Sequence, residues 1–200
     1  IFKNIFDFLF AIVFIVSFSP LFIFIIFLLK FFSNTDVFFI HKRIGKNGNL
    51  FSLYKFRTMK HSRYEILSDY LKNNPEQKKY WKENQKLKND PRVTRIGYFL
   101  REYSLDELPQ VLNVLKGDMS FIGPRPIVEE EKNKYGDKLV YYNRVKPGLS
   151  GLWQVSGRNN TSYNERVKFD CMYVSNISFF NDVKIFFKTI FVIIIKKGAY

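Results

Sequence analysis

The sequence predicts an α+β domain that is mainly helical, with a small β-hairpin and an apolar segment at its N-terminal end. Three observations support this class: a stretch without charge over 8–29, two strand-like runs around Asn47-Gly48, and helical spacing of apolar residues in much of the rest. At 200 residues the chain has the length of one domain with a small appendage. Apolar residue types make up 46 % of it, which is enough for a hydrophobic core.

The N-terminal apolar segment has the length of a membrane helix. No residue between Asp7 and Lys30 is charged, and a helix of that length extends about 33 Å, the thickness of the hydrocarbon core of a bilayer. A signal peptide would have a shorter apolar stretch that ends in small residues, whereas this one continues in Phe, Ile, Leu and Val up to Lys30. We therefore interpret it as a retained membrane segment.

Ser19 and Pro20 interrupt this segment near its middle. A proline inside a helix removes one backbone hydrogen bond. The carbonyl it frees is costly in lipid unless a side chain satisfies it, and Ser17 or Ser19 could do so. Two structures fit the residues: a kinked helix that spans the bilayer, or a helix that enters, turns at Ser-Pro and leaves by the same face. Lys3 and Lys30 lie one on each side, so the flanking charges do not decide.

The charge balance is strongly basic. The chain carries 32 Lys and Arg against 18 Asp and Glu, a formal net charge of +14. Together with the apolar segment, this surplus indicates an anionic lipid surface, a polyanionic substrate, or both. No helix-turn-helix, zinc-finger or aromatic RNA-binding signature is present, so nucleic acid is not an expected partner. With Cys171 as the only cysteine, the chain has no intramolecular disulfide.

Residues 36–59 are typical of two strands joined at Asn47-Gly48, a strong turn pair. In the second strand Lys55 and Arg57 are two residues apart and therefore project from one face. They form either a solvated strand face or an anion site close to the membrane.

Three further stretches have the spacing of helices. Residues 62–89 are rich in Lys, Glu, Asn and Gln, and Pro75 divides them into two helices that we interpret as a solvated cap. Residues 90–104 predict a turn and a short basic helix. Near the C-terminus an apolar stripe bordered by lysines predicts an amphipathic helix, either packed in the core or lying in the interface of an anionic membrane. The stripe comprises Phe179, Phe180, Val183, Phe186, Phe187 and Ile190, and the lysines are Lys184, Lys188, Lys196 and Lys197.

The segment SLDELPQ places two carboxylates, Asp106 and Glu107, next to each other. One interpretation is structural, because Ser104 and Glu107 match a capping box and Gly117 matches the glycine that ends a helix. Pro109, however, falls at the fifth helical position and predicts a loosened turn beside the acids. Neighbouring helical positions point about 100° apart, so the pair can divide two tasks around one centre: one carboxylate attacks and the other holds a metal ion.

Motifs downstream of the acids favour chemistry. In GPRP, Arg125 lies between prolines that fix the backbone, and its planar guanidinium suits a phosphate. KPGLSGLWQVSGRNN has three glycines around Trp153 and Arg158 near its end; such a loop can bring amides close to a phosphate, while Trp153 is more typical of a core. These groups indicate a pyrophosphate substrate with Mg²⁺, which prefers carboxylates and substrate phosphates. Asp118 and Asp170 are further candidate ligands.

From YKFRTM through SLDELPQVLNVLKGDMSFIGPRP and KPGLSGLWQVSGRN to the terminal KKGAY, the chain resembles the bacterial sugar transferases. These are monotopic phosphoglycosyl transferases that begin glycan assembly on polyprenol phosphate. The C-terminal motifs are most similar to the branch that transfers galactose- or glucose-1-phosphate to undecaprenyl phosphate. The resemblance covers nearly the whole chain, and the pairing of Asp-Glu-Leu-Pro with Gly-Pro-Arg-Pro is highly specific.

The resemblance implies a two-step reaction in which Asp106 attacks the sugar-bearing phosphorus of a UDP-sugar and releases UMP. Undecaprenyl phosphate then attacks the phosphosugar–aspartyl intermediate, giving polyprenol-diphosphate-sugar, the first membrane step of O-antigen, capsule or exopolysaccharide synthesis. It also implies that the Ser19-Pro20 helix is re-entrant. Residues 1–34 would then be embedded in the bacterial inner membrane with both ends in the cytoplasm, and residues 35–200 would form a catalytic domain on its cytoplasmic surface, in contact with anionic lipids.

The resemblance further implies that Glu107 holds the Mg²⁺ and that Arg101, Arg125 and Arg158 carry the phosphates, with Lys55 and Arg57 as further basic candidates. Lys146 stands where the family usually has arginine, which alters a fine substrate contact. An alternative from another class is a membrane-anchored basic scaffold or anionic-lipid-binding module in which the acids only cap a helix. No residue selects among hexoses, and a homodimer is compatible with the sequence.

Overall fold

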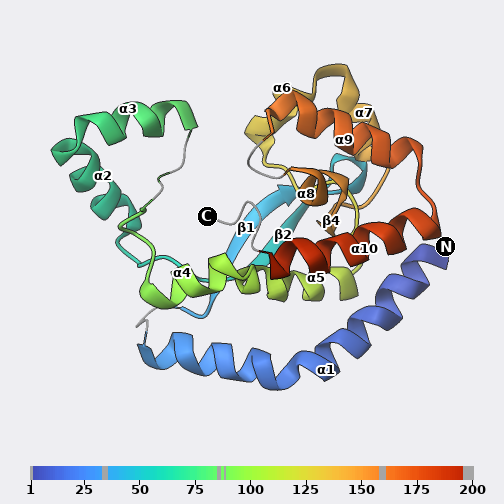
Figure 1. The fold of residues 1–200 in the computed structure, drawn as a ribbon, viewed down its shortest axis with the longest axis horizontal. Helices are drawn as coiled ribbons and strands as arrows, with labels where there is room; N and C mark the ends of the chain where they lie inside the picture. The colour runs from blue at the N-terminus through green and yellow to red at the C-terminus, as the bar shows by residue number, and fades with distance from the viewer. Residues whose placement is uncertain (1, 33–35, 85–86, 88, 158–160, 196–200) are drawn as a thin grey trace.

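The computed structural model describes residues 2–32, 36–84, 87, 89–157 and 161–195. They form a mainly helical α+β structure with a two-stranded antiparallel hairpin and a second, two-stranded parallel pair, as the sequence predicts for class and hairpin (Figure 1). The elements are α1 (Phe2–Phe32), β1 (Phe38–Ile44), η1 (Lys46–Gly48), β2 (Leu50–Phe56), α2 (Arg63–Asn73), α3 (Pro75–Asn84), α4 (Arg95–Glu102), η2 (Leu105–Gln110), α5 (Val111–Leu115), β3 (Ser120–Ile122), η3 (Glu129–Glu131), α6 (Lys132–Tyr135), η4 (Gly136–Lys138), α7 (Leu139–Asn143), β4 (Gly148–Ser150), α8 (Leu152–Ser156), α9 (Tyr163–Ser175) and α10 (Phe179–Ile194), where η denotes a 3₁₀-helix.

Helix α1 continues through Pro20 and is bent in its middle part (Figure 1). The missing N–H of Pro20 leaves the carbonyl of Val16 without its helical donor. The hydroxyl of Ser19 donates to this carbonyl at 2.8 Å, as the sequence predicts for one of the two serines. Because the freed carbonyl is satisfied locally, the expected helix-break-helix is a bent, continuous helix.

Both halves of α1 pack against the rest of the molecule. In the first half Ala11 is fully buried, and the buried carboxylate of Asp7 accepts the N–H of Phe121 at 3.3 Å. In the second half Ile25 and Leu29 are buried with Phe56 of β2. Within the part of the chain that the structure describes, α1 is the one helix long and apolar enough to cross a membrane. Its contacts at both ends hold it along the side of the body.

The hairpin of β1 and β2 is built on its turn and on α5. Asn47 and Gly48 both have positive φ, at 59° and 77°, which is the conformation that tight hairpin turns need. On the other edge of β2 the buried amide of Asn113 replaces a third strand. It accepts the N–H of Tyr54 at 3.0 Å and donates to the carbonyl of Ser52 at 2.7 Å. The hairpin is therefore fixed in place by the helix that follows the acid pair.

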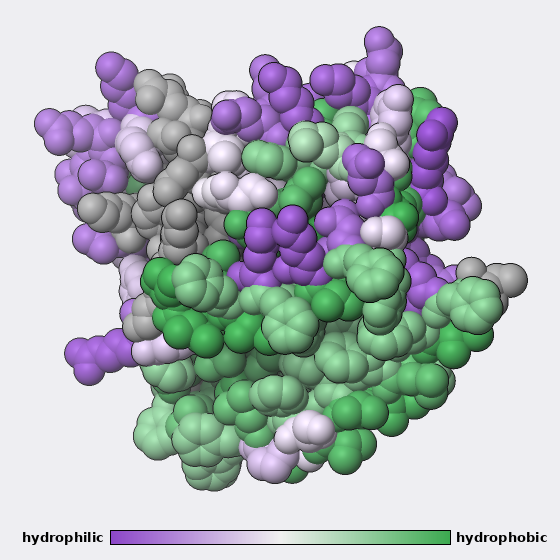
Figure 2. Space-filling model, turned by 45° about the vertical axis from the view of Figure 1, so that its right-hand side comes forward, coloured by the Kyte–Doolittle hydropathy of each residue, from purple (hydrophilic) through white to green (hydrophobic). Residues whose placement is uncertain are grey.

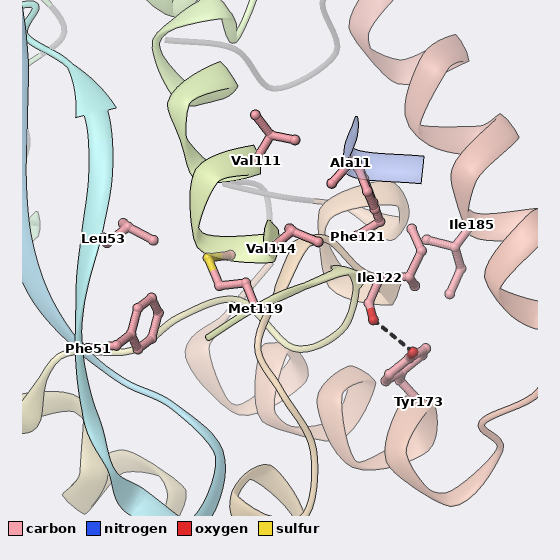
Figure 3. Close-up of a cluster of buried hydrophobic side chains, with 10 residues drawn as sticks. All are labelled: Ala11, Phe51, Leu53, Val111, Val114, Met119, Phe121, Ile122, Tyr173 and Ile185. Carbon is pink, nitrogen blue, oxygen red and sulfur yellow. Dashed lines mark hydrogen bonds between the residues drawn. The ribbon is translucent and has the colours of Figure 1, made fainter. Parts of the chain in front are cut away.

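The main hydrophobic core joins α1, β2, α5, β3, α9 and α10 (Figure 3). Tyr173 of α9 lies at one side of it, where its hydroxyl donates to the carbonyl of Ile122 at 3.0 Å and lies 2.8 Å from Asp182. The buried members are Ala11, Phe51, Leu53, Val111, Val114, Met119, Phe121, Ile122, Tyr173 and Ile185.

Glycines in the KPGLSGLWQVSGRNN stretch allow two backbones to touch. A Cβ at Gly148 would lie 2.1 Å from the nitrogen of Gly123, and a Cβ at Gly151 would lie 2.1 Å from the carbonyl oxygen of Gly123. These glycines therefore serve the pairing of β3 with β4, because they let the β4 segment pass close to the backbone of Gly123, the first residue of GPRP. The expected phosphate-binding role of the loop is not needed to explain them.

The molecular surface is divided into an apolar and a polar part (Figure 2). The apolar part follows α1 and α10. The predicted stripe of α10 faces two ways: Phe186 packs against the core, whereas Phe179, Phe180, Phe187 and Ile190 are exposed. Opposite lie α2 and α3, two helices separated at Pro75 as predicted, which project from the body as a polar arm (Figure 1).

Candidate active site

The acid pair lies on η2, a 3₁₀ turn that does not begin with a capping box. Ser104 adopts the left-handed conformation, φ 55° and ψ 22°, and its side chain makes no cap hydrogen bond. Only its carbonyl takes part, accepting the N–H of Glu107 at 3.3 Å. The capping interpretation of SLDELPQ is therefore wrong, because a residue in this conformation does not have the extended backbone of an N-cap.

Pro109 accounts for the 3₁₀ geometry, as the sequence predicts. It lies inside η2 and is buried, and its missing N–H prevents an α-helical bond to Leu105. Regular helix begins only at Val111 in α5. This short helix ends as predicted at Gly117, with φ 82°, whose N–H donates to Val114.

Two cations from elsewhere in the chain meet Glu107. The ammonium of Lys55 lies 2.7 Å from Oε1 of Glu107 and 4.0 Å from Oδ2 of Asp106. Arg125 contributes a guanidinium nitrogen 3.6 Å from the same Oε1. The predicted candidates Lys55, Asp106, Glu107 and Arg125 thus converge, from β2, η2 and the GPRP loop.

Asp106 is the more deeply placed of the two acids, with 14 % of its side chain exposed against 24 % for Glu107. Burial raises the pKa of Asp106 above its ordinary value, and the neighbouring carboxylate of Glu107 adds to this; Lys55, Arg101 and Arg125 oppose it. A carboxylate with a raised pKa is a stronger base and a better nucleophile once ionised. The surrounding cations keep that ionised form available.

Arg101 of α4 is the next predicted residue at the site. Its Nε donates to the hydroxyl of Thr58 at 2.9 Å, which holds the guanidinium beside the end of the hairpin. Burial lowers the pKa of Arg101, and Asp106 is the charge that most strongly raises it. Arg101 is therefore a partly buried positive charge directed at the acid pair.

Trp153 connects Arg125 to a second, largely buried cluster. Its ring is 9 % exposed and lies 5.9 Å from the guanidinium of Arg125 and 4.9 Å from that of Arg166. Arg166 is paired with Glu131 at 3.1 Å. The core interpretation of Trp153 is confirmed, and the ring positions two arginines.

Asp170 lies in this second cluster. It is 2 % exposed, accepts a hydrogen bond from the hydroxyl of Tyr135 at 2.6 Å, and lies 4.0 Å from Nε of Arg166. Burial raises the pKa of Asp170 to about 6. Its carboxylate is thus engaged in holding α6 against α9, apart from the turn that carries Asp106.

Two other predicted residues, Arg57 and Asp118, have their described partners away from the acid pair. Arg57 pairs with Asp36 at 3.0 Å at the end of the hairpin. Asp118 accepts a hydrogen bond from Asn113 at 3.3 Å, and Asn113 in turn bonds the backbone of β2. Arg158 lies outside the described residues.

Arg43 and Arg166 are basic residues near the site that the sequence interpretation did not select. Arg43 lies 3.9 Å from Glu131 and donates to the carbonyl of Pro126 at 3.5 Å. Its position opposite Phe51 puts it on the same hairpin face as Lys55, and alternation along β1 could have identified it. Arg166 contacts Asp170 one turn on in α9, but its partners Glu131 and Trp153 come from other elements, so local spacing did not single it out.

The acid pair suits a magnesium ion that arrives with its substrate. Among the described residues no three Asp, Glu, His or Cys side chains converge. Mg²⁺ usually keeps several waters and takes one or two carboxylates together with substrate phosphates, which is what Asp106 and Glu107 can supply. A permanently held structural ion would require more protein ligands than the turn offers.

Comparison with known proteins identifies the chain's family. The family model of bacterial sugar transferases matches residues 1–196. The chain belongs to this family. It is 50 % identical over 198 residues to the exopolysaccharide production protein ExoY of Rhizobium meliloti (strain 1021), covering 99 % of this chain and 88 % of that protein. The match to the undecaprenyl-phosphate galactose phosphotransferase of Salmonella typhimurium (strain LT2) is 52 % over 160 residues. It covers 80 % of this chain and 34 % of that protein, so the chain spans about a third of that longer relative.

An uncharacterized sugar transferase of Bacillus subtilis (strain 168), EpsL, is 36 % identical over 198 residues, with 99 % of this chain and 90 % of that protein covered. Membership of the bacterial sugar transferase family makes this chain an enzyme, so the scaffold alternative is wrong.

Proposed function

We propose that this sugar transferase moves a sugar-1-phosphate from a UDP-sugar to undecaprenyl phosphate and releases UMP. The observation that supports it most strongly is the convergence of Lys55 and Arg125 on adjacent carboxylates, one of them with a raised pKa. Relatives named as undecaprenyl-phosphate galactose and glucose-1-phosphate transferases support the choice of acceptor.

In the first step an ionised oxygen of Asp106 attacks the sugar-bearing phosphorus, a new P–O bond forms, and the bond to the UMP oxygen breaks with its electron pair on UMP. In the second step a phosphate oxygen of undecaprenyl phosphate attacks the same phosphorus. The bond to Asp106 then breaks and restores the carboxylate. No proton has to move in either step, so aligned positive charge is the main requirement.

The chain's own residues meet that requirement. Lys55 and Arg125 lie against Glu107 and beside Asp106, where a diphosphate would bring its negative charge. Arg101 adds charge from the side of α4. Glu107 is the residue that would hold Mg²⁺, which supplies charge neutralisation of the diphosphate when bound.

Asp106→Asn tests the mechanism, because an amide keeps the size of the side chain and cannot attack. We expect UMP release from a UDP-sugar in the presence of undecaprenyl phosphate to fall at least about 10³-fold, with an unchanged thermal midpoint. Asp69→Asn is the matched control, since this carboxylate is 72 % exposed on α2. Undiminished turnover of Asp106→Asn would refute the mechanism.

The apolar surface supports a monotopic arrangement in the bacterial inner membrane. α1 pairs with the body near its N-terminal end, through Lys3 and Asp182, and near its C-terminal end, through Leu29 and Phe56. A helix that crossed the bilayer would carry one end away from the body. The re-entrant α1 would instead place both ends, and the active site, on the cytoplasmic side, with α10 in the lipid interface.

Labelling of introduced cysteines tests this topology. In a Cys171→Ala background, Phe2→Cys and Asp36→Cys should both be protected from a membrane-impermeant maleimide in intact cells and react after lysis. Labelling of one of them in intact cells would establish a spanning helix.

A further inference from the structure

The hairpin face that carries Lys55 continues onto β1 as a row of aromatic and basic side chains. Phe39 pairs with Lys55 and His41 pairs with Leu53. The side chains of each pair project from the same face, with Cβ atoms about 5 Å apart. Arg43 follows on that face two residues later. Phe39 is therefore the cross-strand neighbour of the lysine that bonds Glu107.

Phe39, His41 and Arg63 form a shelf of planar side chains there, with the rings of Phe39 and His41 tilted by 41° to each other. The rings of Phe39 and His41 lie 5.8 Å apart, and the guanidinium of Arg63, at the start of α2, lies 5.1 Å from the centre of the Phe39 ring. Phe39 and Arg63 are half-buried and His41 is exposed. Burial lowers the pKa of His41, and the positive charges of Arg43, Arg63 and Lys55 lower it further, whereas Glu130 raises it. The imidazole is therefore neutral at neutral pH.

The other large aromatic ring beside the site is not arranged for stacking. Trp153 is buried, with 9 % of the residue exposed, whereas Phe39 is half-buried; two guanidinium groups, of Arg125 and Arg166, lie beside the Trp153 ring and one, of Arg63, lies beside the Phe39 ring. Its indole N–H donates to the hydroxyl of Thr161 at 2.7 Å. The aromatic surface that a planar ligand can reach therefore lies on the β1 side of Lys55, because Phe39 is half-buried and Trp153 is buried.

We propose that the Phe39–His41–Arg63 shelf binds the base of the nucleotide that leaves during the reaction, an inference that rests on the proposed function. The leaving nucleotide must extend away from the phosphorus that Asp106 attacks. Lys55 lies at that point, and the shelf begins on the adjacent strand. A pyrimidine stacks on the aromatic and guanidinium planes, while Arg63 and His41 offer N–H donors to its carbonyl oxygens.

The test compares two ligands that share a sugar phosphate and differ in the base: UMP and ribose 5-phosphate. Both are titrated by calorimetry into the full chain in lipid nanodiscs. The shelf variants are Phe39→Leu and Arg63→Met. Phe38→Leu, on the opposite face of the same strand, and Lys72→Met, near the far end of α2, are the matched controls.

We expect each shelf variant to weaken UMP about 10-fold and ribose 5-phosphate less than twofold, so that the ratio of the two dissociation constants collapses. The controls should keep the wild-type ratio. A wild-type ratio in both shelf variants, or equal weakening of both ligands, would overturn the shelf. If wild type still releases UMP from a UDP-sugar when either of these results is obtained, only the shelf proposal fails. If wild type releases no UMP but the shelf variants change the ratio, the proposed reaction fails instead.

Discussion

Two segments of this chain share the pattern Ser-x-x-Glu and fold differently. Ser162 caps α9, where it accepts the N–H of Glu165 at 3.3 Å and Glu165 accepts the N–H of Ser162 at 2.8 Å, a complete capping box. Ser104 is left-handed and caps nothing. The difference is Pro109, which follows Glu107 by two positions and prevents a regular helix. One pattern thus gives a helix start in one place and two half-buried acids on a 3₁₀ turn in the other.

The charges follow the same division. Hydrogen bonds from Ser162 lower the pKa of the exposed Glu165, as expected for a cap. At the other turn burial raises the pKa of Asp106, and Lys55 opposes it. A capping acid is stabilised by its own helix, whereas Asp106 depends on cations supplied by distant parts of the chain.

After Asp106→Asn, the largest expected effect is that of Lys55→Met, which removes the main cation opposing the raised pKa of Asp106. We expect kcat/KM to fall about 10²-fold. The pKa of Asp106 should rise further, so the acid limb of the pH profile should move to higher pH, because only the ionised carboxylate attacks. The pH profile of UMP release measures both effects.

Lys116→Met is the control for this prediction. The ammonium of Lys116 lies 4.5 Å from the ring of Tyr54, the residue that precedes Lys55 and points to the other face of β2. Its substitution should leave the acid limb in place. An unmoved acid limb in Lys55→Met would show that Lys55 does not control the ionisation of Asp106.

The next largest effect is on stability and comes from Asp170, a buried acid apart from the turn that carries Asp106. Its pKa is raised to about 6 in the folded state, so the folded state holds its proton more tightly than the unfolded state does. The free energy of unfolding should therefore decrease as pH rises from about 4 to 6, by about 3 kcal/mol at 1.36 kcal/mol for each unit of pKa.

Asp170→Asn should remove this dependence. Thermal unfolding of wild type and variant across this pH range measures the difference between their stabilities, which should shrink as pH falls through 6. A difference that stays constant from pH 4 to 7 would mean that Asp170 does not titrate in this range.

The smallest effect distinguishes the two serines directly. Ser162→Ala should cost about 1 kcal/mol of stability because it removes a cap, whereas Ser104→Ala should change stability by less than about 0.5 kcal/mol. Denaturant unfolding of both variants measures this. A loss at Ser104 as large as that at Ser162 would restore the capping box that the structure lacks.

Local rules predicted the features that depend on neighbouring residues. The Asn47-Gly48 turn, the separation of α2 and α3 at Pro75 and the bond from Ser19 to the freed carbonyl follow from backbone chemistry within a few positions. The capping rule failed at Ser104, although the proline that overrides it was visible in the same segment.

Contacts between distant residues could not be derived in this way. Lys55 and Arg57 were expected to act together, but Lys55 bonds Glu107 across 52 residues while Arg57 turns back to Asp36. The pairing of Tyr135 with Asp170 spans 35 residues. Such partners are fixed by how α5, α6 and α9 pack, which alternation and helical spacing do not encode.

Peptide mapping of the enzyme after incubation with a UDP-sugar alone tests the central claim most directly. Without the lipid acceptor the second step is blocked, and the account predicts a phosphosugar adduct on the peptide that contains Asp106, accompanied by release of one UMP for each adduct. UMP release only when undecaprenyl phosphate is added, with Asp106 unmodified throughout, would contradict it and establish direct transfer.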